Sequence, residues 1–319
     1  MPRSAELVVD PAVSLRGLTR HFGDVAAVRD LSFDVRRGEL FGIVGPDGAG
    51  KTTTLRALAG VLSPSGGDAL LNGISVMQDP EGVKHHLAYM SQRFGLYTDL
   101  TVRENIDFYA DLFLVPPVER AARRERLYRF SGLGPFESRL AGQLSGGMKQ
   151  KLGLCCALIH EPEIMLLDEP TFGVDPISRR DLWLIVHEMV ARGVTVLVAT
   201  AYLDEAERCD RVAMLHEGRL IALDTPGALR ERLAGRVQMV HTDAPRAARD
   251  LLRREPAVRE ATLFGDRVHV TLDDPQRDWP AARAALYAAG VTVISEGLTE
   301  PTLEDVFIHL VGGAASADA

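Results

Sequence analysis

The sequence predicts an α/β fold followed by a second, smaller α+β domain. A glycine-rich loop at 45–54 lies between a short apolar run, Leu40–Val44, and an apolar helical pattern at 51–59. From residue 236 onward, short strand and helix patterns alternate in a new order. A chain of 319 residues, 46% of them apolar, is also long enough to bury the cores of two domains.

The glycine-rich loop fits the pattern G-x-x-x-x-G-K-[ST], whose backbone N–H groups wrap the phosphates of a nucleotide. The helix that follows adds the partial positive charge of its N-terminus. Lys51 is expected to reach the β- and γ-phosphates, and the Thr52 hydroxyl to coordinate Mg²⁺. A glycine-rich turn that matches by chance is the alternative. The residues predicted to hold the nucleotide are Gly45, Pro46, Asp47, Gly48, Ala49, Gly50, Lys51, Thr52 and Thr53.

Alternating apolar and polar residues at 13–18 and Val25–Val35 predict antiparallel strands before this loop. Phe22 lies between them, and it is either a surface turn residue or a ring placed to stack on a purine. Further on, Gln92 follows the apolar run Leu87–Met90. A glutamine at a strand end usually faces solvent. At the carboxyl edge of a nucleotide-binding sheet, however, it can reach Mg²⁺ or an attacking water.

Two helical patterns then predict a helical subdomain inserted at about 93–160. The first opens with a capping box formed by Thr101 and Glu104. The second, at 118–130, is rich in arginine. These arginines are most simply a solvated face, with nucleic-acid binding as the weaker interpretation.

A second anion-binding motif lies in the run LSGGMKQ at 144–150. Ser145, Gly146 and Gly147 open a predicted helix, and their backbone N–H groups point out of its N-terminus. A second phosphate site so far along the chain makes sense if two nucleotide-binding domains face each other. Each domain would then offer this motif to the γ-phosphate held by the other.

The apolar run Ile164–Asp168 predicts a buried strand that ends in two carboxylates. Asp168 fits a Mg²⁺ role, and Glu169 is the natural base to polarise the water that attacks the γ-phosphate. An ordinary strand ending in a charged turn is the alternative. Asp175 then caps a further helix at 177–191, with proline at its first position.

The composition of the chain limits which partners and which cellular compartment are expected. The net charge of −8 argues against nucleic acid as the main partner. Three cysteines without a C-x-x-C pair indicate no disulfide framework and favour a reducing cytosol. No apolar run reaches the roughly 18 residues of a membrane-spanning helix, so any membrane role must come through another subunit.

Together these motifs resemble the nucleotide-binding domain of the ATP-binding-cassette (ABC) superfamily, over about residues 13–235. The resemblance implies a P-loop NTPase with an antiparallel β subdomain, a mixed sheet core and an inserted helical subdomain. It implies an ATPase that binds ATP and Mg²⁺ and works as a head-to-tail dimer, either a homodimer or a heterodimer with a second cassette. Phe22 and Asp175 would complete the nucleotide site. Catalysis would fall to Glu169, Lys51 and Gln92, and Mg²⁺ to Thr52, Gln92 and Asp168.

The amino-acid sequences of the segments at 97–105 and 202–207 are similar to those of the branch partnered with ABC-2-type permeases, such as the daunorubicin-resistance ATPases. This resemblance implies a separate integral membrane permease that exports a drug-like or lipophilic substrate. The chain would then be cytoplasmic and peripheral on the inner face of the membrane. A soluble ABC protein acting on ribosomes or DNA is the alternative, which the absence of a second cassette in the chain disfavours.

Two positions depart from the family pattern. Ala201 stands where the family usually has a histidine that contacts the γ-phosphate. The subunit therefore either hydrolyses ATP slowly, pairs with a cassette that retains the histidine, or acts mainly by dimer closure. Asp47 stands where asparagine is usual, and we expect its carboxylate to point away from the phosphates.

The second domain, at 236–311, follows a βαββαβ order that suggests a ferredoxin-like fold. Residues 1–12 are an N-terminal extension, and 312–319 are expected to form a disordered tail. No catalytic constellation is apparent in this domain, so dimer stabilisation or regulation is its expected role, with ligand sensing as the weaker interpretation. The expected elements are strands at 237–241, 261–264, 268–272 and 291–295, and helices at 244–254, 279–289 and 302–310.

Overall fold

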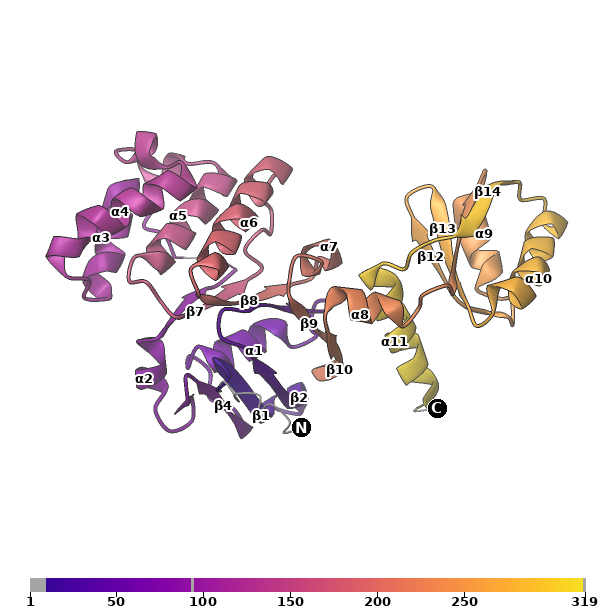
Figure 1. The fold of residues 1–319 in the computed structure, drawn as a ribbon, viewed down its shortest axis with the longest axis horizontal. Helices are drawn as coiled ribbons and strands as arrows, with labels where there is room; N and C mark the ends of the chain where they lie inside the picture. The colour runs from indigo at the N-terminus through magenta and orange to yellow at the C-terminus, as the bar shows by residue number, and fades with distance from the viewer. Residues whose placement is uncertain (1–9, 93–94, 318–319) are drawn as a thin grey trace, which may run out of the picture. The chain divides into compact units, whose positions relative to one another are not determined.

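The computed structural model describes residues 10–92 and 95–317. The chain divides into two compact units (Figure 1). The first comprises Met1–Tyr202 with Leu215–Leu220, and the second Leu203–Met214 with Ile221–Ala319. This division places 203–214 and 221–235 with the second unit, whereas the sequence analysis assigns them to the first domain.

Two strands before the glycine-rich loop, β1 and β2, and two after it, β4 and β5, form one antiparallel sheet. Its strand order is β2-β1-β4-β5, and β1 pairs with both β2 and β4 in antiparallel register. The predicted antiparallel strands at the start of the chain are therefore confirmed. The bounds are β1 Val13–Phe22, β2 Val25–Val35, β4 Gly66–Leu71 and β5 Ile74–Ser75.

The central sheet has the order β10-β9-β3-β8-β7-β6. Its pairs β3–β8, β8–β7 and β7–β6 are parallel, so the carboxyl ends of these four strands meet at one edge. Every residue of β3, β7 and β8 is buried, which explains why these strands read as unbroken apolar runs. The bounds are β3 Leu40–Val44, β6 Leu87–Met90, β7 Ile164–Asp168, β8 Thr195–Thr200, β9 Arg211–His216 and β10 Arg219–Asp224.

The helices of the first unit include the predicted inserted group. The capping box is confirmed: the Thr101 hydroxyl accepts from the Glu104 N–H, and the Glu104 carboxylate accepts from the Thr101 N–H. α5 packs against α3, α4 and α6, which builds a helical layer away from β1 and β2 (Figure 1). The bounds are α1 Lys51–Leu58, α2 Pro80–Lys84, α3 Val102–Leu112, α4 Pro117–Ser131, α5 Gly146–Leu158 and α6 Pro176–Ala191, with short 3₁₀ turns at Gly134–Phe136 and Ala141–Gln143.

The second unit contains an antiparallel sheet with the order β12-β13-β11-β14. If β11 to β14 are numbered 1 to 4 and the sheet is read from β14, its strand order is 4-1-3-2. This is the order of a ferredoxin-like βαββαβ fold, so the predicted fold is confirmed. Where the sequence analysis expects a disordered tail from residue 312, α11 continues to Ala317. The bounds are α7 Leu203–Ala206, α8 Pro226–Glu231, β11 Val237–Thr242, α9 Pro245–Leu252, β12 Val258–Phe264, β13 Arg267–Leu272, α10 Pro275–Ala288, β14 Val293–Leu298 and α11 Leu303–Ala317.

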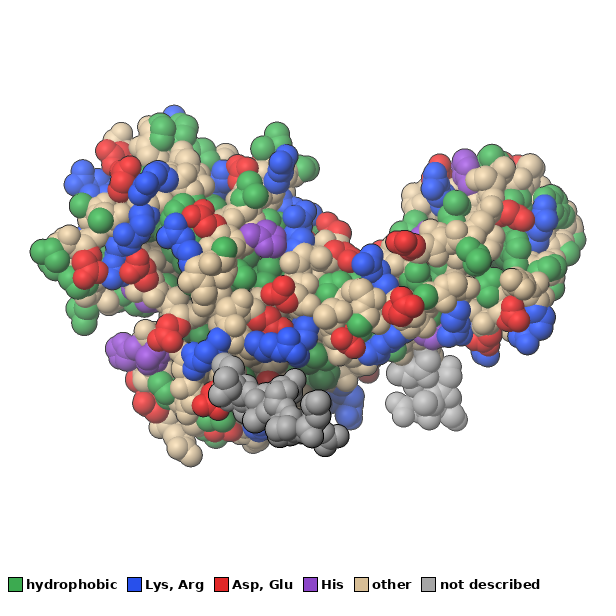
Figure 2. Space-filling view, viewed as in Figure 1, with side chains coloured by type: hydrophobic (Ala, Val, Ile, Leu, Met, Phe, Trp, Pro, Cys, Tyr) green, Lys and Arg blue, Asp and Glu red, His purple; other side chains and the backbone are tan. Residues whose placement is uncertain are grey.

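The surface is mixed in charge. Figure 2 shows Lys and Arg interspersed with Asp and Glu over the visible face of each unit. Within the described residues, no helix has both the length and the apolar character needed to cross a bilayer.

Candidate functional site

The glycine-rich loop joins β3 to α1 at the carboxyl edge of the central sheet. Gly50 is the N-cap of α1 and takes a φ of +99°, in the region that favours glycine. A Cβ atom here would also lie 2.5 Å from the carbonyl oxygen of Ala27. Glycine is therefore required both by the backbone conformation and by the close approach of β2. The first N–H groups of α1 have no helical acceptor and are available to an anion.

The Lys51 side chain is only 5% exposed and lies along this loop. Its ammonium donates to the carbonyl oxygens of Gly45 at 2.8 Å and Pro46 at 3.0 Å. The Glu169 carboxylate lies 3.8 Å away. A buried ammonium group needs such partners to offset its loss of hydration. These partners also keep the Lys51 ammonium close to the backbone N–H groups of the loop.

Thr52 and Asp168 meet beside Lys51. The Thr52 hydroxyl donates to Asp168 Oδ1 at 2.9 Å, although 116 positions separate them in the chain. Asp168 is 1% exposed and ends β7, as predicted. Tyr89 on β6 donates its hydroxyl to Asp168 Oδ2 at 3.2 Å. Burial, and secondly the Asp168 charge, raise the pKa of Tyr89 to about 12, so the phenol stays protonated and remains a donor.

Glu169 follows Asp168 with a φ of +49°, an uncommon conformation for a residue with a side chain. Its N–H donates to Ala199 O at 2.8 Å, and its own carbonyl accepts from Phe172 N at 3.1 Å. The Gln92 amide donates to Glu169 Oε2 at 2.8 Å. The turn therefore aims the carboxylate toward both Gln92 and Lys51 instead of along the strand.

Lys51, Thr52, Gln92 and Glu169 line one cleft of about 760 Å³. Of the predicted site residues, Gly45, Pro46 and the buried Asp168 are not among the described residues that line it. Phe22 is not among the described residues that line it. The Phe22 ring is 48% exposed, and the Arg20 guanidinium lies over it at 4.7 Å from the centroid. The sequence analysis missed the β2 side of the cleft and Glu217. The cleft lining comprises Val25, Ala26, Ala27, Arg29, Asp47, Gly48, Ala49, Gly50, Lys51, Thr52, Thr53, Gln92, Glu169 and Glu217.

The second predicted phosphate motif does not line this cleft. Ser145 is the N-cap of α5, and its hydroxyl accepts from Met148 N at 3.3 Å. Ser145 and Gly146 are exposed, whereas Gly147 is buried against α6. Asp175 is the N-cap of α6, and hydrogen bonds from the N–H groups of Ser178 and Ile177 lower the pKa of its carboxyl group. The motif therefore faces solvent, where a second polypeptide could reach it.

Ala201, which departs from the family pattern, is exposed directly after β8. The turn there is ordered by Tyr202, whose N–H donates to the Thr200 hydroxyl at 3.0 Å. The Arg179 guanidinium lies over the Tyr202 ring at 4.8 Å. The Ala201 methyl group itself offers no hydrogen bond to a nucleotide.

The oxygen donors present fit a magnesium ion. The Thr52 hydroxyl donates its hydrogen bond to Asp168, which leaves a lone pair of the hydroxyl oxygen for a cation. Gln92 donates through its amide nitrogen, which leaves its carbonyl oxygen available. Hydroxyl, carboxylate and amide oxygens are the hard ligands that Mg²⁺ prefers. The described residues contain no group of three or more His, Cys, Asp or Glu side chains that could hold a metal by themselves.

The loop, the buried lysine and the carboxylates at the end of β7 define a P-loop nucleotide-binding protein. Residues 28–172 match the ABC transporter family, and residues 225–311 match the C-terminal domain of ATP-binding proteins similar to DrrA1-3. The chain is 35% identical to the Nod factor export ATP-binding protein I of Burkholderia lata, over 94% of this chain and 97% of the relative. The chain thus belongs to the ATP-binding proteins of the ABC transporter family, and the resemblance stated from the sequence is confirmed.

Other relatives are named for multidrug transport and for drug resistance. The chain is 44% identical to the probable multidrug ABC transporter ATP-binding protein YbhF of Escherichia coli, over 97% of this chain and 54% of that protein. It thus spans about half the length of the first relatives it matches. It is also 33% identical to the daunorubicin resistance protein DrrA2 of Streptomyces coeruleorubidus, over 94% and 95% of the two chains.

Solved structures confirm the predicted cassette fold. An ATP-binding subunit of an ABC transporter matches with a TM-score of 0.64 and 32% identity, over 69% of this chain and 92% of that one. A dimeric ATP-binding cassette bound to ADP and Pi matches with a TM-score of 0.61 and 24% identity, over 67% and 98%.

Proposed function

We propose that this chain hydrolyses ATP and so powers a separate ABC-2-type membrane permease that exports a drug-like or lipophilic substrate. One observation carries the proposal. Lys51, Thr52 and Glu169 line a single cleft at the N-terminus of α1, and the Thr52 hydroxyl is hydrogen-bonded to the buried Asp168 beneath. The relatives named for multidrug transport and daunorubicin resistance support the export of such substrates.

Each of these side chains has a distinct task in hydrolysis. Lys51 exchanges its carbonyl partners for phosphate oxygens and stabilises the negative charge that develops there. Glu169 accepts a hydrogen bond from the attacking water and polarises it, while Gln92 orients that carboxylate. Thr52, Asp168 and Gln92 would hold Mg²⁺, which neutralises phosphate charge when bound.

The proposal includes a head-to-tail dimer, either of two copies or with a second cassette. The exposure of Ser145 and Gly146 supports it, because neither residue is among the described residues that line the cleft of their own chain. The dimeric cassette among the solved structures has the same fold. In such a dimer, Ser145, Gly146 and Gly147 of one copy would contact the ATP held by Lys51 and Thr52 of the other.

The permease would dock on the helical subdomain. Exposed apolar side chains gather at the C-terminal end of α3 and the start of α4, where Leu114 is 83% and Val118 89% exposed. Figure 2 shows apolar side chains at this end of the helical layer. A cluster of large exposed apolar groups marks an interaction site. It comprises Tyr97, Phe108, Leu112, Phe113, Leu114 and Val118. Such docking would make the chain a peripheral protein on the cytoplasmic face of the membrane.

The function is tested with Glu169→Gln, which keeps the side-chain shape and removes the base. ATP turnover should fall at least about 100-fold while ATP binding persists, because general-base catalysis contributes about 10²- to 10⁴-fold. Glu125→Gln, an exposed change on α4, is the matched control and should leave turnover unchanged. Equal turnover in wild type and Glu169→Gln would exclude the proposed role of this carboxylate.

A second candidate function is an ATP-dependent clamp that closes with little hydrolysis. The exposed methyl group of Ala201 favours it, since the position offers no donor to a γ-phosphate. In a heterodimer with a cassette that retains the histidine, the exposed Ser145 motif of this chain would serve the site of the partner.

A further inference from the structure

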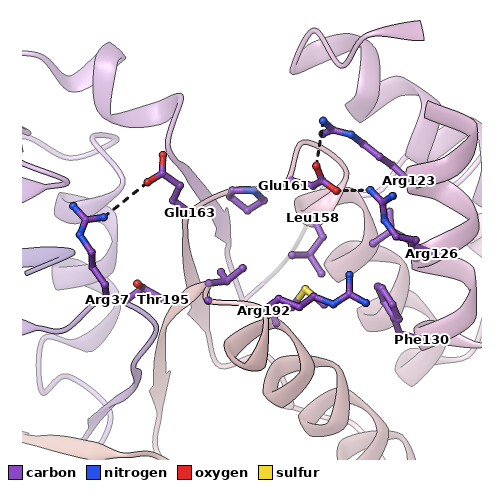
Figure 3. Close-up of a pocket in the computed structure, with 14 residues that line it drawn as sticks. Arg37, Arg123, Arg126, Phe130, Leu158, Glu161, Glu163, Arg192 and Thr195 are labelled. Atoms are coloured by element: carbon purple, nitrogen blue, oxygen red, sulfur yellow. Dashed lines mark hydrogen bonds and ion pairs between the residues drawn. The ribbon is translucent and has the colours of Figure 1, made fainter. Parts of the chain in front are cut away.

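A second cavity lies at the opposite edge of the central sheet from the nucleotide cleft. Its volume is about 500 Å³, within the range of small-molecule sites. It is bordered by Arg37 before β3, Glu163 before β7 and Thr195 at the start of β8. α4 and the C-terminal ends of α5 and α6 close the other side (Figure 3). The nucleotide-binding residues follow the carboxyl ends of the same strands, so the two sites are distinct.

The floor of this cavity is apolar. Leu127, Leu158 and Met189 are each 5% exposed and come from α4, α5 and α6. The half-buried ring of Phe130 forms part of the wall beside them. An apolar floor with an aromatic wall favours a ligand that has an apolar or aromatic body.

Four arginines and two glutamates line the rim, and two further glutamates behind it, Glu119 and Glu188, pair with Arg123 and Arg192. The arginines therefore gather at this rim within a chain whose net charge is −8. Figure 3 shows Arg37 and Glu163 on the sheet side and the arginines of α4 on the other. Glu161 is shared, because Arg123 and Arg126 both pair with it.

Arg192 is the arginine best placed to take a further anion. Its guanidinium lies over the Phe130 ring at 4.8 Å from the centroid, and one nitrogen donates to Glu188 at 2.8 Å. A guanidinium has five N–H donors in a planar fork, so this single bond leaves capacity for a carboxylate or phosphate. The side chain is 47% exposed, so a ligand can reach it from solvent.

We propose that this cavity binds a small amphipathic anion, with an apolar or aromatic body on the Leu127–Leu158–Met189 floor and an anionic head at Arg192 and Arg126. The site is built from α4 on one side and the sheet edge on the other, so a bound ligand links these elements. The proposal concerns binding alone and does not depend on ATP hydrolysis.

The test uses 8-anilinonaphthalene-1-sulfonate as a fluorescent probe on the full chain, with saturating ATP present. 2-Naphthoate should displace the probe at least about fivefold better than the neutral 2-naphthamide, because a charged partner strengthens hydrogen bonds to a guanidinium. Arg192→Gln should weaken both the probe and 2-naphthoate about fivefold. Arg129→Gln, an exposed change on the same helix as Phe130, is the control and should alter neither.

Glu161→Gln separates a ligand site from a purely structural cluster of ion pairs. Removing this carboxylate frees the donors of Arg126 and removes a repulsive charge, while Arg123 keeps its pair with Glu119, so binding should tighten about threefold. If Arg192→Gln does not fold, the affinity of Glu161→Gln for the probe still tests whether the cavity is a ligand site. Weaker binding in Glu161→Gln, equal displacement by the acid and the amide, or no probe signal in the presence of saturating ATP would each overturn the proposal.

Discussion

At the scale of the residue, Gly147 combines a predicted role with an unpredicted one. The sequence assigns its N–H to a phosphate, but the structure also packs its α-carbon against α6. A Cβ at Gly147 would lie 2.2 Å from Ser178 Oγ and 2.3 Å from Ser178 Cβ. The α5–α6 packing therefore requires a glycine here independently of any nucleotide.

Gly147→Ala should lower the free energy of unfolding by about 1–3 kcal/mol, the usual effect of overpacking. Ser178→Gly in the same chain should restore part of this loss, because it removes the contacting atoms. Gly146→Ala is the matched control: the nearest heavy atom to its added Cβ is 3.9 Å away. Urea unfolding followed by circular dichroism measures all three, and equal stability of Gly146→Ala and Gly147→Ala would contradict the packing argument.

Ala201→His tests the clamp against the hydrolysing enzyme. If the missing imidazole limits hydrolysis, turnover should rise by roughly 10²-fold, since one transition-state hydrogen bond contributes about that much. Ala201→Phe adds a ring without a donor at the same exposed position and is the control. Unchanged turnover in Ala201→His would show that the imidazole is not limiting in this chain.

The motifs predicted the charged centre of the site, because each carries its chemistry within a few consecutive residues. The structure brings Lys51, Thr52, Asp168 and Glu169 together. The tyrosine on β6 was missed, since its bond to Asp168 depends on the register between neighbouring strands. Stacking by Phe22 and nucleotide contacts by Asp175 stay predictions, as do the roles of the other site residues.

At the scale of the element, local capping rules located most helix starts. α6 begins at Pro176 after the Asp175 cap, one residue before the predicted range. The largest error in a helix start is in α10, which begins at Pro275 and not near residue 279. Asp274 caps it by accepting from two N–H groups, and Pro280 lies inside the first two turns. The internal proline obscured the true start, because a proline beyond the first turn lacks one helical hydrogen bond and usually marks a helix boundary.

The capping box of α3 makes an acid-dependent contribution to stability. Hydrogen bonds from the Thr101 N–H and hydroxyl lower the pKa of Glu104 below its usual 4.5. A lowered folded-state pKa stabilises the fold above the unfolded pKa, and this contribution is lost as the pH falls through the folded pKa. Between about pH 7 and pH 3, Glu104→Gln should therefore lose less thermal stability than wild type.

Glu125→Gln, an exposed change on α4, is the reference for removing a carboxylate without a cap. Melting temperatures measured across the pH series give the comparison. If the curves of wild type and Glu104→Gln stay parallel down to about pH 3, the capping carboxylate does not contribute in this way.

At the scale of the whole molecule, the ferredoxin-like domain has its own core. Val240, Leu252, Val268 and Leu286 belong to one buried cluster drawn from its sheet and from α9 and α10. α11 contacts α8 as well as β12 and β13, and it buries Leu303 and Val306. α11 also contacts α7, but a fragment of residues 225–317 contains the buried cluster of the sheet, α9 and α10 together with α8 and α11.

This fragment should unfold cooperatively when expressed alone, as small single domains with one core do. A shorter fragment, 237–298, lacks α8 and α11 and should have a lower unfolding midpoint in urea, because the surfaces under α11 become exposed. Dispersed amide resonances and a sigmoidal unfolding curve are the expected observations for the longer fragment. A longer fragment that is disordered, or no more stable than the shorter one, would contradict an independent core.

At this scale the sequence predicted the cassette fold and the ferredoxin-like fold correctly, the latter from its βαββαβ succession of elements. It could not predict the cavity at the far edge of the central sheet. Its arginines come from α4, from the residue after α6 and from the turn before β3, and only the packing of these elements brings them together.

The left-handed backbone of Glu169 has a consequence for the evolution of this chain. Asparagine and glycine adopt that conformation more readily than glutamate, so replacing Glu169 should relieve local strain. Selection for heat resistance alone would then discard the residue proposed to activate water. Variants recovered from such a screen would gain thermal stability and lose ATP turnover through a change at this one position.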